Sequence, residues 1–356
     1  MADTAARPAA EAVTGTLTVL HSLAPPDGTT KFVDQIAGGA PPEVAVRYFS
    51  WSRALRDEYD VLHLHWPELL LRARTKRQRF AKRQAMRMLL LRTRAKGVPI
   101  VRTAHNLQPH EVGGRAERRL LAEIDRRTDL FIRLNPTTAL PEGSRAVTIL
   151  HGHYLDRFAG HPRSDVVPGR LLYFGIIRPY KGVERLLDVY AAERPDATEL
   201  RLVGNPTPAL RERVQAAVDA DDRVTARLAF VDDDELVREV TAADLVVLPY
   251  SEMHNSGVLL VALSLGRRVL VPRSPSNTAI SEEVGPGWVI QYDGEFGPEA
   301  LALGVAALRE GPLDGRPDLA DRDWDAVGRR HADAYRALLH DRRRGRGAIA
   351  SPAGSA

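Results

Sequence analysis

Short apolar runs recur along most of the chain, and a polar or amphipathic stretch separates each run from the next. In the first half of the sequence they occupy residues 17–20, 44–48, 61–64, 98–103, 130–134 and 147–150. In the second half they occupy residues 171–174, 200–203, 224–228, 245–248, 269–271 and 288–290. Runs this short and this uniformly apolar are typical of strands that a parallel sheet buries on both faces. The pattern therefore predicts two series of parallel strands.

Helical periodicity fills most of the intervals between these runs. In the first half it covers residues 69–96, with Gly97 as the expected C-cap, and residues 115–127. In the second half it covers residues 183–190, 208–218, 232–241 and 258–265, with a short helix at 281–284. Strands that alternate with helices predict an α/β protein built from doubly wound, Rossmann-like parallel sheets.

The two strand series divide the chain into two expected domains, which suits a length of 356 residues. We expect one domain at residues 15–155 and the other at 168–310, joined by a segment rich in Pro, Gly and His. An amphipathic helix at about 322–341 is expected to pack back on the first domain. Residues 1–14 and 342–356 have compositions that favour disordered tails.

The composition narrows the setting in which the protein works. There is no cysteine, which excludes disulfides and thiolate metal sites and fits a reducing cytoplasm. No run of about 18 apolar residues occurs, so we expect no transmembrane helix. The N-terminus lacks the apolar segment of a signal peptide. We therefore expect a cytoplasmic protein.

The charge is distributed unevenly along the chain. The net charge is +4, yet residues 69–110 contain many Arg and Lys and no acidic residue. One interpretation is a helix that lies on an anionic membrane surface at the inner face of the plasma membrane, at about 1 kcal/mol per cation near the headgroups. The alternative is a solvated helix whose apolar side faces the core. We do not expect a nucleic-acid partner, because Phe80 is the only aromatic residue in the predicted basic helix.

Ligands of open parallel sheets bind beyond the carboxyl ends of the strands, and one such loop in the second half suits a diphosphate. Gly175 ends an apolar run, and Arg178 and Lys181 follow it just ahead of a helix. A helix N-terminus beside two cations is an anion-binding arrangement. The alternative is a surface loop with two solvated bases.

A second helix start lies further along the same half. Asn255 or Ser256 is placed to N-cap the helix that follows, and Gly257 lets a ligand approach the backbone closely. The alternative is a plain helix cap. Two helix starts that suit an anion predict a diphosphate held between them.

Several of these segments resemble glycosyltransferases of the GT-B superfamily. They are Phe174-Gly175 with Lys181-Gly182, Leu202-Val203-Gly204 and Asn255-Ser256-Gly257, together with residues 63–68 and 103–106. The resemblance covers about residues 17–308 and is closest to bacterial GDP-mannose:glycolipid 4-β-D-mannosyltransferases of exopolysaccharide assembly. It implies two Rossmann-like domains facing a cleft, the first binding the acceptor and the second the nucleotide sugar.

The resemblance also implies the substrates and the residues that bind them. The donor would be a nucleotide sugar, with mannose from GDP-mannose favoured, and the acceptor a polyprenyl-diphosphate-linked or other glycan. No cofactor and no metal would be required. The residues expected to bind the donor are Gly175, Arg178, Lys181, Gly204, Asn205, Tyr250, Glu252, Asn255, Ser256 and Gly257.

Formation of a β-mannoside from an α-linked donor inverts the anomeric centre and requires a base. The candidates are His105, His65 and Glu68, which follow strands on the expected acceptor side. Each has a structural alternative: His105 would cap its loop, and Glu68 would N-cap the basic helix. His63 lies inside a strand pattern and is expected in the core.

Two further patterns resemble metal sites, and two competing functions remain to be weighed. Residues 232–234 (Asp-Asp-Asp) mimic a metal-binding motif but are expected at a helix N-terminus, and His151 with His153 is weak support for zinc. The competing functions are transfer from another nucleotide sugar and epimerisation of a nucleotide sugar. An epimerase would need carboxylates deep in the cleft, whereas the strand ends here carry histidines.

Overall fold

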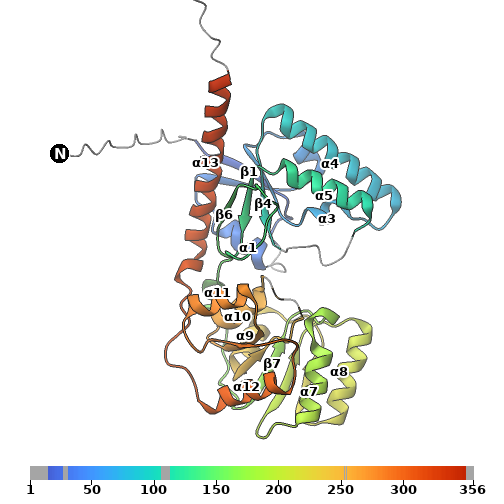
Figure 1. Cartoon of the computed structure of the whole chain (residues 1–356), viewed down its shortest axis with the longest axis vertical. Helices are drawn as coiled ribbons and strands as arrows, with labels where there is room; N and C mark the ends of the chain where they lie inside the picture. The colour runs from blue at the N-terminus through green and yellow to red at the C-terminus, as the bar shows by residue number, and fades with distance from the viewer. Residues whose placement is uncertain (1–14, 27–30, 106–112, 252, 254, 350–356) are drawn as a thin grey trace, which may run out of the picture.

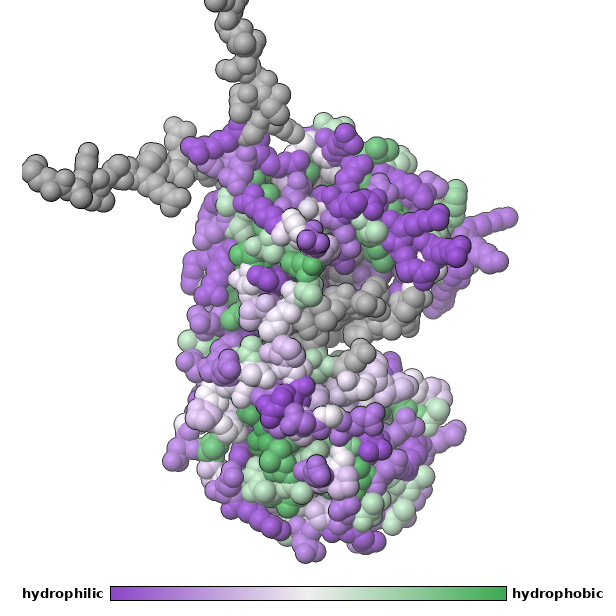
Figure 2. Space-filling view, viewed as in Figure 1, coloured by the Kyte–Doolittle hydropathy of each residue, from purple (hydrophilic) through white to green (hydrophobic). Residues whose placement is uncertain are grey.

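Two six-stranded parallel sheets, stacked end to end in Figure 1, form the body of the protein. The computed structural model describes the chain except residues 1–14, 27–30, 106–112, 252, 254 and 350–356. Figure 2 shows two lobes with the surface hollowed between them. The α/β class and the two doubly wound sheets that the sequence predicts are confirmed. The predicted tail at residues 1–14 lies outside the described residues.

The first sheet has the strand order β2-β1-β3-β4-β5-β6. Its strands are β1 (Leu17–His21), β2 (Val44–Tyr48), β3 (Val61–Leu64), β4 (Ile100–Ala104), β5 (Leu130–Arg133) and β6 (Ala146–Thr148). The central strands β3, β4 and β5 are mostly buried, whereas the edge strands β2 and β6 are partly exposed. Because β1, β3 and β4 are neighbours at the centre of the sheet, the loops that follow them meet at one edge.

Helices cover both faces of this sheet (Figure 1). On one face, α1 (Lys31–Gly38) and α13 (Trp324–Ile349) pack on residues such as Val19 and Val61. On the other face lie α2 (Trp51–Arg56), α3 (Pro67–Leu71), α4 (Lys76–Lys96) and α5 (Arg115–Arg127). The predicted packing of the C-terminal helix on the first domain is thus what the structure shows.

The basic segment is two helices rather than the single helix predicted for residues 69–96. The break lies between α3 and α4, where the Thr75 hydroxyl accepts a bond from the Gln78 amide (3.2 Å) and Gln78 Oε1 accepts one from the Thr75 amide (3.4 Å). This capping box starts a new helix and overrides the continuous periodicity. Gly97, with φ +66°, is the C-cap that the sequence predicts.

The second sheet has the order β12-β11-β10-β7-β8-β9. Its strands are β7 (Arg170–Phe174), β8 (Glu199–Val203), β9 (Val224–Arg227), β10 (Leu245–Val247), β11 (Arg268–Pro272) and β12 (Val289–Tyr292). Its helices are α7 (Val183–Glu193), α8 (Pro208–Ala220), α9 (Asp233–Ala242), α10 (Gly257–Ser264), α11 (Pro275–Val284) and α12 (Pro298–Arg309). The central strand β7 ends next to the loop that was predicted to bind a diphosphate.

Some helices were not predicted, and others were predicted too short. The unpredicted ones are α1, α2, α6 (Leu155–Phe158) and α12. Three of them have at most eight residues, and helices this short depend on tertiary packing more than on local propensity. The helix α11 begins at Pro275 instead of 281, because Ser274 accepts a bond from the Asn277 amide (3.2 Å).

The predicted disordered tail at residues 342–356 is wrong for its first part, because α13 continues to Ile349. At the start of this extension Arg342 Nη1 lies 3.3 Å from Asp129 Oδ2, next to a pair in which Asp341 Oδ2 lies 2.7 Å from Arg145 Nη2. Residues 350–356 lie outside the described part of the chain. No helix among the described residues is both long and apolar enough to span a membrane.

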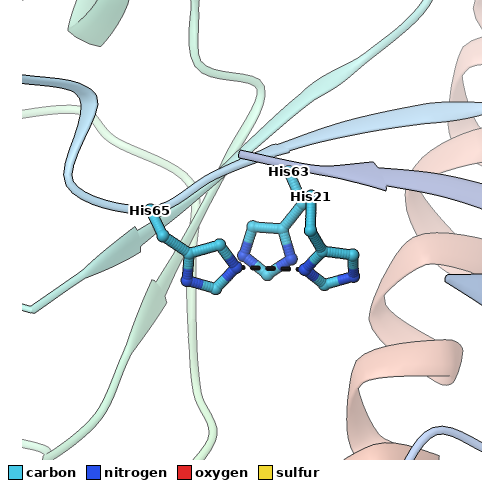
Figure 3. A group of neighbouring side chains, drawn as sticks. All are labelled: His21, His63 and His65. Atoms are coloured by element: carbon cyan, nitrogen blue, oxygen red, sulfur yellow. Dashed lines mark hydrogen bonds between the residues drawn. The ribbon is translucent and has the colours of Figure 1, made fainter. Parts of the chain in front are cut away.

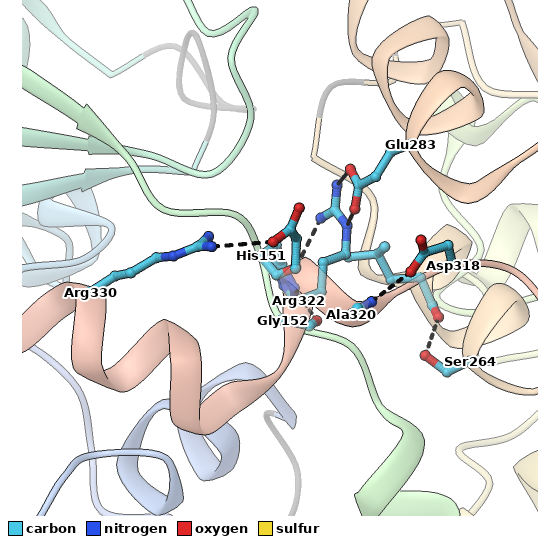
Figure 4. Close-up of polar contacts among 10 residues, drawn as sticks. His151, Gly152, Ser264, Glu283, Asp318, Ala320, Arg322 and Arg330 are labelled. Carbon is cyan, nitrogen blue, oxygen red and sulfur yellow. Dashed lines mark hydrogen bonds and ion pairs between the residues drawn. The ribbon is translucent and has the colours of Figure 1, made fainter.

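A buried arginine joins the two halves where the chain crosses back (Figure 4). Arg322 is 2% exposed, makes two 2.6 Å bonds to the Glu283 carboxylate of the second half, and donates to the His151 carbonyl of the first (2.9 Å). Arg157 likewise pairs with Asp34 (2.8 Å) and Asp233 (2.7 Å). These contacts fix the distance between the two sheets.

Candidate active site

Three histidines form a hydrogen-bonded row along the carboxyl edge of the first sheet. His21 ends β1, His65 follows β3, and His105 follows β4. His65 Nε2 lies 3.1 Å from His21 Nδ1, and His65 Nδ1 lies 3.1 Å from His105 Nε2. Figure 3 shows the first of these contacts, with the His63 ring beside it. The structure therefore brings His65 and His105, two predicted catalytic residues, into direct contact.

The period of a β-strand explains why these rings share one face. Residues two apart in a strand point to the same side, so His63 and His65 face the side that Val61 faces, toward α13. His21 follows Val19 on the same side, and it lies opposite His63 in the parallel register of β1 and β3. The row is thus set by strand period and strand order together.

His63 is a structural residue, as predicted. It is fully buried, and its Nδ1 lies 2.6 Å from Tyr335 Oη while its Nε2 lies 2.8 Å from Thr103 Oγ1. Both ring nitrogens therefore have partners within the core. The ring ties β3 to β4 and to α13, which is enough to account for its place in the strand.

The turn after β3 holds the catalytic candidates rigidly. Trp66 adopts φ +43°, a conformation that a non-glycine residue rarely takes, and its ring stacks on His105 with 3.8 Å between centroids. Ser22 Oγ accepts a 2.6 Å bond from the His65 amide. The ring of Phe32 packs against His105 at 4.9 Å. These contacts keep the imidazoles in place without adding charge.

Burial keeps this histidine row neutral. The pKa values of His65 and His105 lie well below the ordinary value, first because burial penalises the charged form and then because positive charge on neighbouring histidines, or on Arg102 beside His105, would oppose it. Burial lowers the pKa of His21 to about 3. A neutral imidazole keeps a lone pair that can take up a proton, but burial makes the imidazolium that forms costly.

Glu68, the third predicted catalytic residue, lies in the first turn of α3. The N-cap position belongs to Trp66 and the first helical position to Pro67, so the alternative that Glu68 is the N-cap is wrong. An acidic side chain in this turn interacts favourably with the helix dipole. Among the described residues no hydrogen bond joins Glu68 to His65 or His105.

Glycines shape the facing edge of the second sheet. Gly175 has φ +113° and Gly204 φ +155°. A Cβ on Gly204 would lie 1.8 Å from the Gly175 carbonyl oxygen, so no other residue fits there without moving the backbone. The Asn205 carbonyl accepts a 3.3 Å bond from the Ile177 amide. The predicted donor-binding residues Gly175, Gly204 and Asn205 therefore lie together.

Two cations follow this pair of strand ends. Arg178 Nη1 donates to the Ile177 carbonyl (2.8 Å) and the Asn205 carbonyl (3.2 Å), which fixes its guanidinium beside the glycines. Lys181 Nζ donates to Tyr250 Oη (3.1 Å) and lies 4.6 Å from the centre of that ring. Burial, and then the charge of Arg178, lower the pKa of Lys181 to about 8. Two cations that raise each other's energy favour an anion between them.

The loop that follows Tyr250 touches the histidine edge. Asn255 Nδ2 donates to the His105 carbonyl (2.6 Å), and Asn255 Oδ1 accepts from Asn135 Nδ2 (2.5 Å). Ser256, not Asn255, is the N-cap of α10, where its hydroxyl accepts from the Leu259 amide (3.3 Å). A Cβ on Gly257 would lie 3.3 Å from Tyr154 Oη. Glu252, also predicted to bind the donor, lies outside the described residues.

Comparisons with known proteins agree with this geometry. Residues 168–310 match the family model described as glycosyl transferases group 1. The chain is 49% identical over 325 residues to a GDP-mannose:glycolipid 4-beta-D-mannosyltransferase of Xanthomonas campestris pv. campestris, covering 91% of this chain and 93% of that protein. This chain belongs to the group 1 glycosyltransferases.

Solved structures show that the glycosyltransferase has the GT-B fold. The Anabaena protein HepE in complex with UDP and glucose matches with a TM-score of 0.60, at 15% identity, over 90% of this chain and 100% of that one. The catalytic domain of starch synthase IV from Arabidopsis thaliana, bound to ADP and acarbose, matches with a TM-score of 0.62, at 10% identity, over 92% and 99%.

The residues that sequence reasoning missed come from outside the predicted motifs. Asn135 follows β5 and bonds to Asn255 of the donor loop. His21, the last residue of β1, lies in none of the predicted motifs. His331 of α13 also lies near the row, and its charge would act on His21. A long-range contact between α13 and β1 leaves no local signal in the sequence.

The acidic residues 232–234 of the glycosyltransferase lie at a helix N-terminus, as predicted. Asp232 N-caps α9 by accepting a 2.8 Å bond from the Glu235 amide, while Asp233 pairs with Arg157. Two groups of described side chains lie close enough to share an ion: His21 with His63 and His65, and His153 with Asp156 and Asp323. The partners of His63 described above already occupy both its nitrogens. Metal independence stays a prediction.

Proposed function

We propose that this glycosyltransferase transfers mannose from GDP-mannose to the sugar of a glycolipid, forming a β-linkage with inversion and without a metal ion. The relative from Xanthomonas campestris supports the donor and the acceptor class, because the identity extends over nearly the full length of both chains. The nucleotides bound to GT-B neighbours, UDP and ADP, differ from the proposed donor. The donor base is therefore the first thing to test.

In this mechanism the second domain holds the leaving group. The bond from the mannose C1 to the phosphate oxygen breaks, and negative charge gathers on the GDP diphosphate. Lys181 and Arg178 would neutralise that charge, while the glycine edge at Gly175 and Gly204 lets the diphosphate approach the backbone. Cations held in place before the reaction can supply what a metal ion supplies in other transferases.

The first domain would supply the base. As the acceptor oxygen bonds to C1 on the face opposite the diphosphate, its proton passes to the neutral imidazole of His105. His65 hydrogen-bonds the other nitrogen of that ring, Nε2, and orients it (3.1 Å). Burial keeps His105 neutral, so its lone pair is available, and it also makes a lasting imidazolium costly.

The observation that carries the proposal is the bond from Asn255 to the His105 carbonyl. The same loop carries Tyr250, which contacts Lys181, so a single stretch of chain spans from the cation to the base-bearing strand. A sugar held between them would have its leaving group on one side and its base on the other. That is the arrangement that an inverting displacement needs.

The basic helix supports an anionic lipid acceptor. A cavity of about 650 Å³ lies between α4 and the start of α5, and its lining includes the cations Arg72, Lys76, Arg79 and Arg83, the ring of Phe80, and Glu117, which pairs with Arg72 and Arg83. Phe80 is 64% exposed, and Met88 and Leu91 of the same helix are also exposed. Cations beside exposed apolar side chains suit a membrane surface or the diphosphate of a lipid-linked sugar.

The test uses purified enzyme with radiolabelled GDP-mannose and an oligosaccharide linked to a polyprenyl diphosphate. We expect a β-1,4-mannosylated lipid, at the same rate with or without EDTA. UDP-, ADP- and dTDP-sugars in parallel test the base, and reactions without acceptor test for an epimerised donor. Preference for another nucleotide sugar, loss of activity in EDTA, or epimerisation would contradict the proposal.

A further inference from the structure

The histidine row does not end at His65, and it leads away from the acceptor side. His21 at the far end has its Nδ1 toward His65 (3.1 Å) and is 3% exposed. Beyond it lies a small cavity whose lining includes His21, Ile36, Pro41, His331 and Tyr335. The volume open to the centre of a water molecule is about 10 Å³. This is close to the minimum that one buried water molecule needs.

His331 lines this cavity, and its ring has one defined proton-accepting atom. Its Nδ1 lies 2.8 Å from the Val327 carbonyl, which can only accept, so Nδ1 carries the ring proton. Its Nε2 is then an acceptor, and it is buried with no hydrogen-bond partner in the described part of the chain. An orphaned acceptor in a cavity beside another imidazole is the setting in which a buried water bridges two rings.

We propose that His105, His65 and His21 form a proton relay that carries the acceptor's proton to the water-sized cavity at His331. This rests on the proposed role of His105 as the base. His21 is thereby a further residue of the reaction, although it touches neither substrate.

The proton count closes at every step. Each 3.1 Å nitrogen pair holds one proton, and two tautomer arrangements satisfy both pairs. In the first, Nε2 carries the proton on His105 and on His65. When the acceptor's proton reaches His105 Nδ1, the Nε2 protons of His105 and His65 move to His65 Nδ1 and His21 Nδ1. The proton on His21 Nε2 passes, through a water that the cavity has room for, to the lone pair of His331 Nε2, and the row is left in the second arrangement.

The surroundings of the row favour passing the proton on over keeping it at His105. Among the described residues, no carboxylate hydrogen-bonds or ion-pairs with these three rings, and positive charge on His151 or Arg102 adds to the cost of an imidazolium at His105. A proton kept at His105 would therefore be unstable, whereas passing it along leaves all three rings neutral. Partly exposed residues such as Ala40 and Pro41 also line the cavity, so it reaches toward the surface.

The test compares His21 with His63, an equally buried imidazole of the same cluster that lies outside the row. His21→Gln fills the site with an amide that cannot take up a proton, and we expect mannosyl transfer in a single turnover to slow by about tenfold or more with donor affinity unchanged. His21→Ala leaves a hole of ring size, and added imidazole is expected to restore transfer. Added imidazole is not expected to restore transfer in His63→Ala.

The possible results distinguish failure of the proton relay from failure of the proposed mannosyl transfer. A wild-type enzyme that does not transfer mannose defeats the proposed function. A wild-type enzyme that transfers mannose, with His21→Gln equally fast, overturns the relay alone. Imidazole that restores His63→Ala as well as His21→Ala, or fails to restore His21→Ala, also overturns it. Stoichiometric zinc bound to the purified protein would also overturn the relay, because His21 and His65 would then be metal ligands. If His21→Ala does not fold, His21→Gln and the wild-type zinc analysis decide.

Discussion

The carboxyl edges of the two sheets carry opposite kinds of chemistry on the same scaffold. The first edge presents buried, neutral imidazoles that bond to one another, His105 to His65 and His65 to His21. The second presents glycines in conformations that other residues avoid, beside the cations Arg178 and Lys181. One edge can take up a proton, and the other can hold an anion.

The difference shows how a parallel sheet is adapted by its strand ends alone. The cores of both domains are similar apolar layers. What differs is that histidines on the first sheet share one face and lose their charge by burial, whereas the second sheet leaves Lys181 only partly covered. Changes at either edge should therefore damage different steps of the same reaction.

The largest effect is expected at the histidine edge. His105→Gln should lower kcat by about 10²- to 10⁴-fold, because a general base contributes on that order. The KM for GDP-mannose should stay within about threefold, since the cations are untouched. Glu68→Gln is the matched comparison, and steady-state kinetics measure both. A larger loss in Glu68→Gln than in His105→Gln would move the base to α3.

Acid should damage the two domains unequally. Burial lowers the pKa of His21 to about 3 and of His151 and His331 to about 4, while the unfolded value is about 6.5. Between those values the unfolded chain binds more protons, so the free energy of unfolding falls as the pH falls from about 6.5 to 4. The slope is about 1.4 kcal/mol per pH unit for each such histidine.

Between residues 168 and 310 the only histidine is His254. Hydrogen exchange near pH 5 should therefore show β1, β3 and β4 losing protection before β7, β8 and β10. Simultaneous loss in both sheets would mean that the inter-domain contacts, such as those of Arg322, dominate the response. Earlier loss in the second sheet would contradict the burial argument.

A smaller effect is expected from pH at the cation edge. Because the pKa of Lys181 is lowered to about 8, the free enzyme loses this charge as the pH rises through that value. The kcat/KM for the donor should then fall by about tenfold per pH unit. Lys181→Arg should remove this alkaline limb, because an arginine keeps its charge. If kcat/KM still falls at high pH in Lys181→Arg, the fall is caused by the titration of another group.

Much of the fold could be predicted because its signals are local. Short apolar runs and the helices between them are sufficient to place both sheets. The break at Thr75 and the early start of α11 at Ser274 depend on single capping bonds, which periodicity does not register. The extension of α13 begins with Arg342, whose partner Asp129 is far away in sequence.

The candidate site was predictable only residue by residue. Strand ends pointed to His65, His105, Arg178 and Lys181, and the structure groups them by edge. It could not be foreseen that Asn255 would bond to the His105 strand, because that contact depends on the spacing of the two domains. The place of His331 beside His21 depends on how α13 packs across the first sheet.

Calorimetric titration of GDP-mannose into three variants tests the division of labour most directly. Lys181→Met should abolish measurable binding, His105→Gln should bind like the wild type, and Lys96→Met, the same change on the distant helix α4, should also bind normally. The account is contradicted if Lys181→Met keeps its affinity, or if His105→Gln loses it to the same extent.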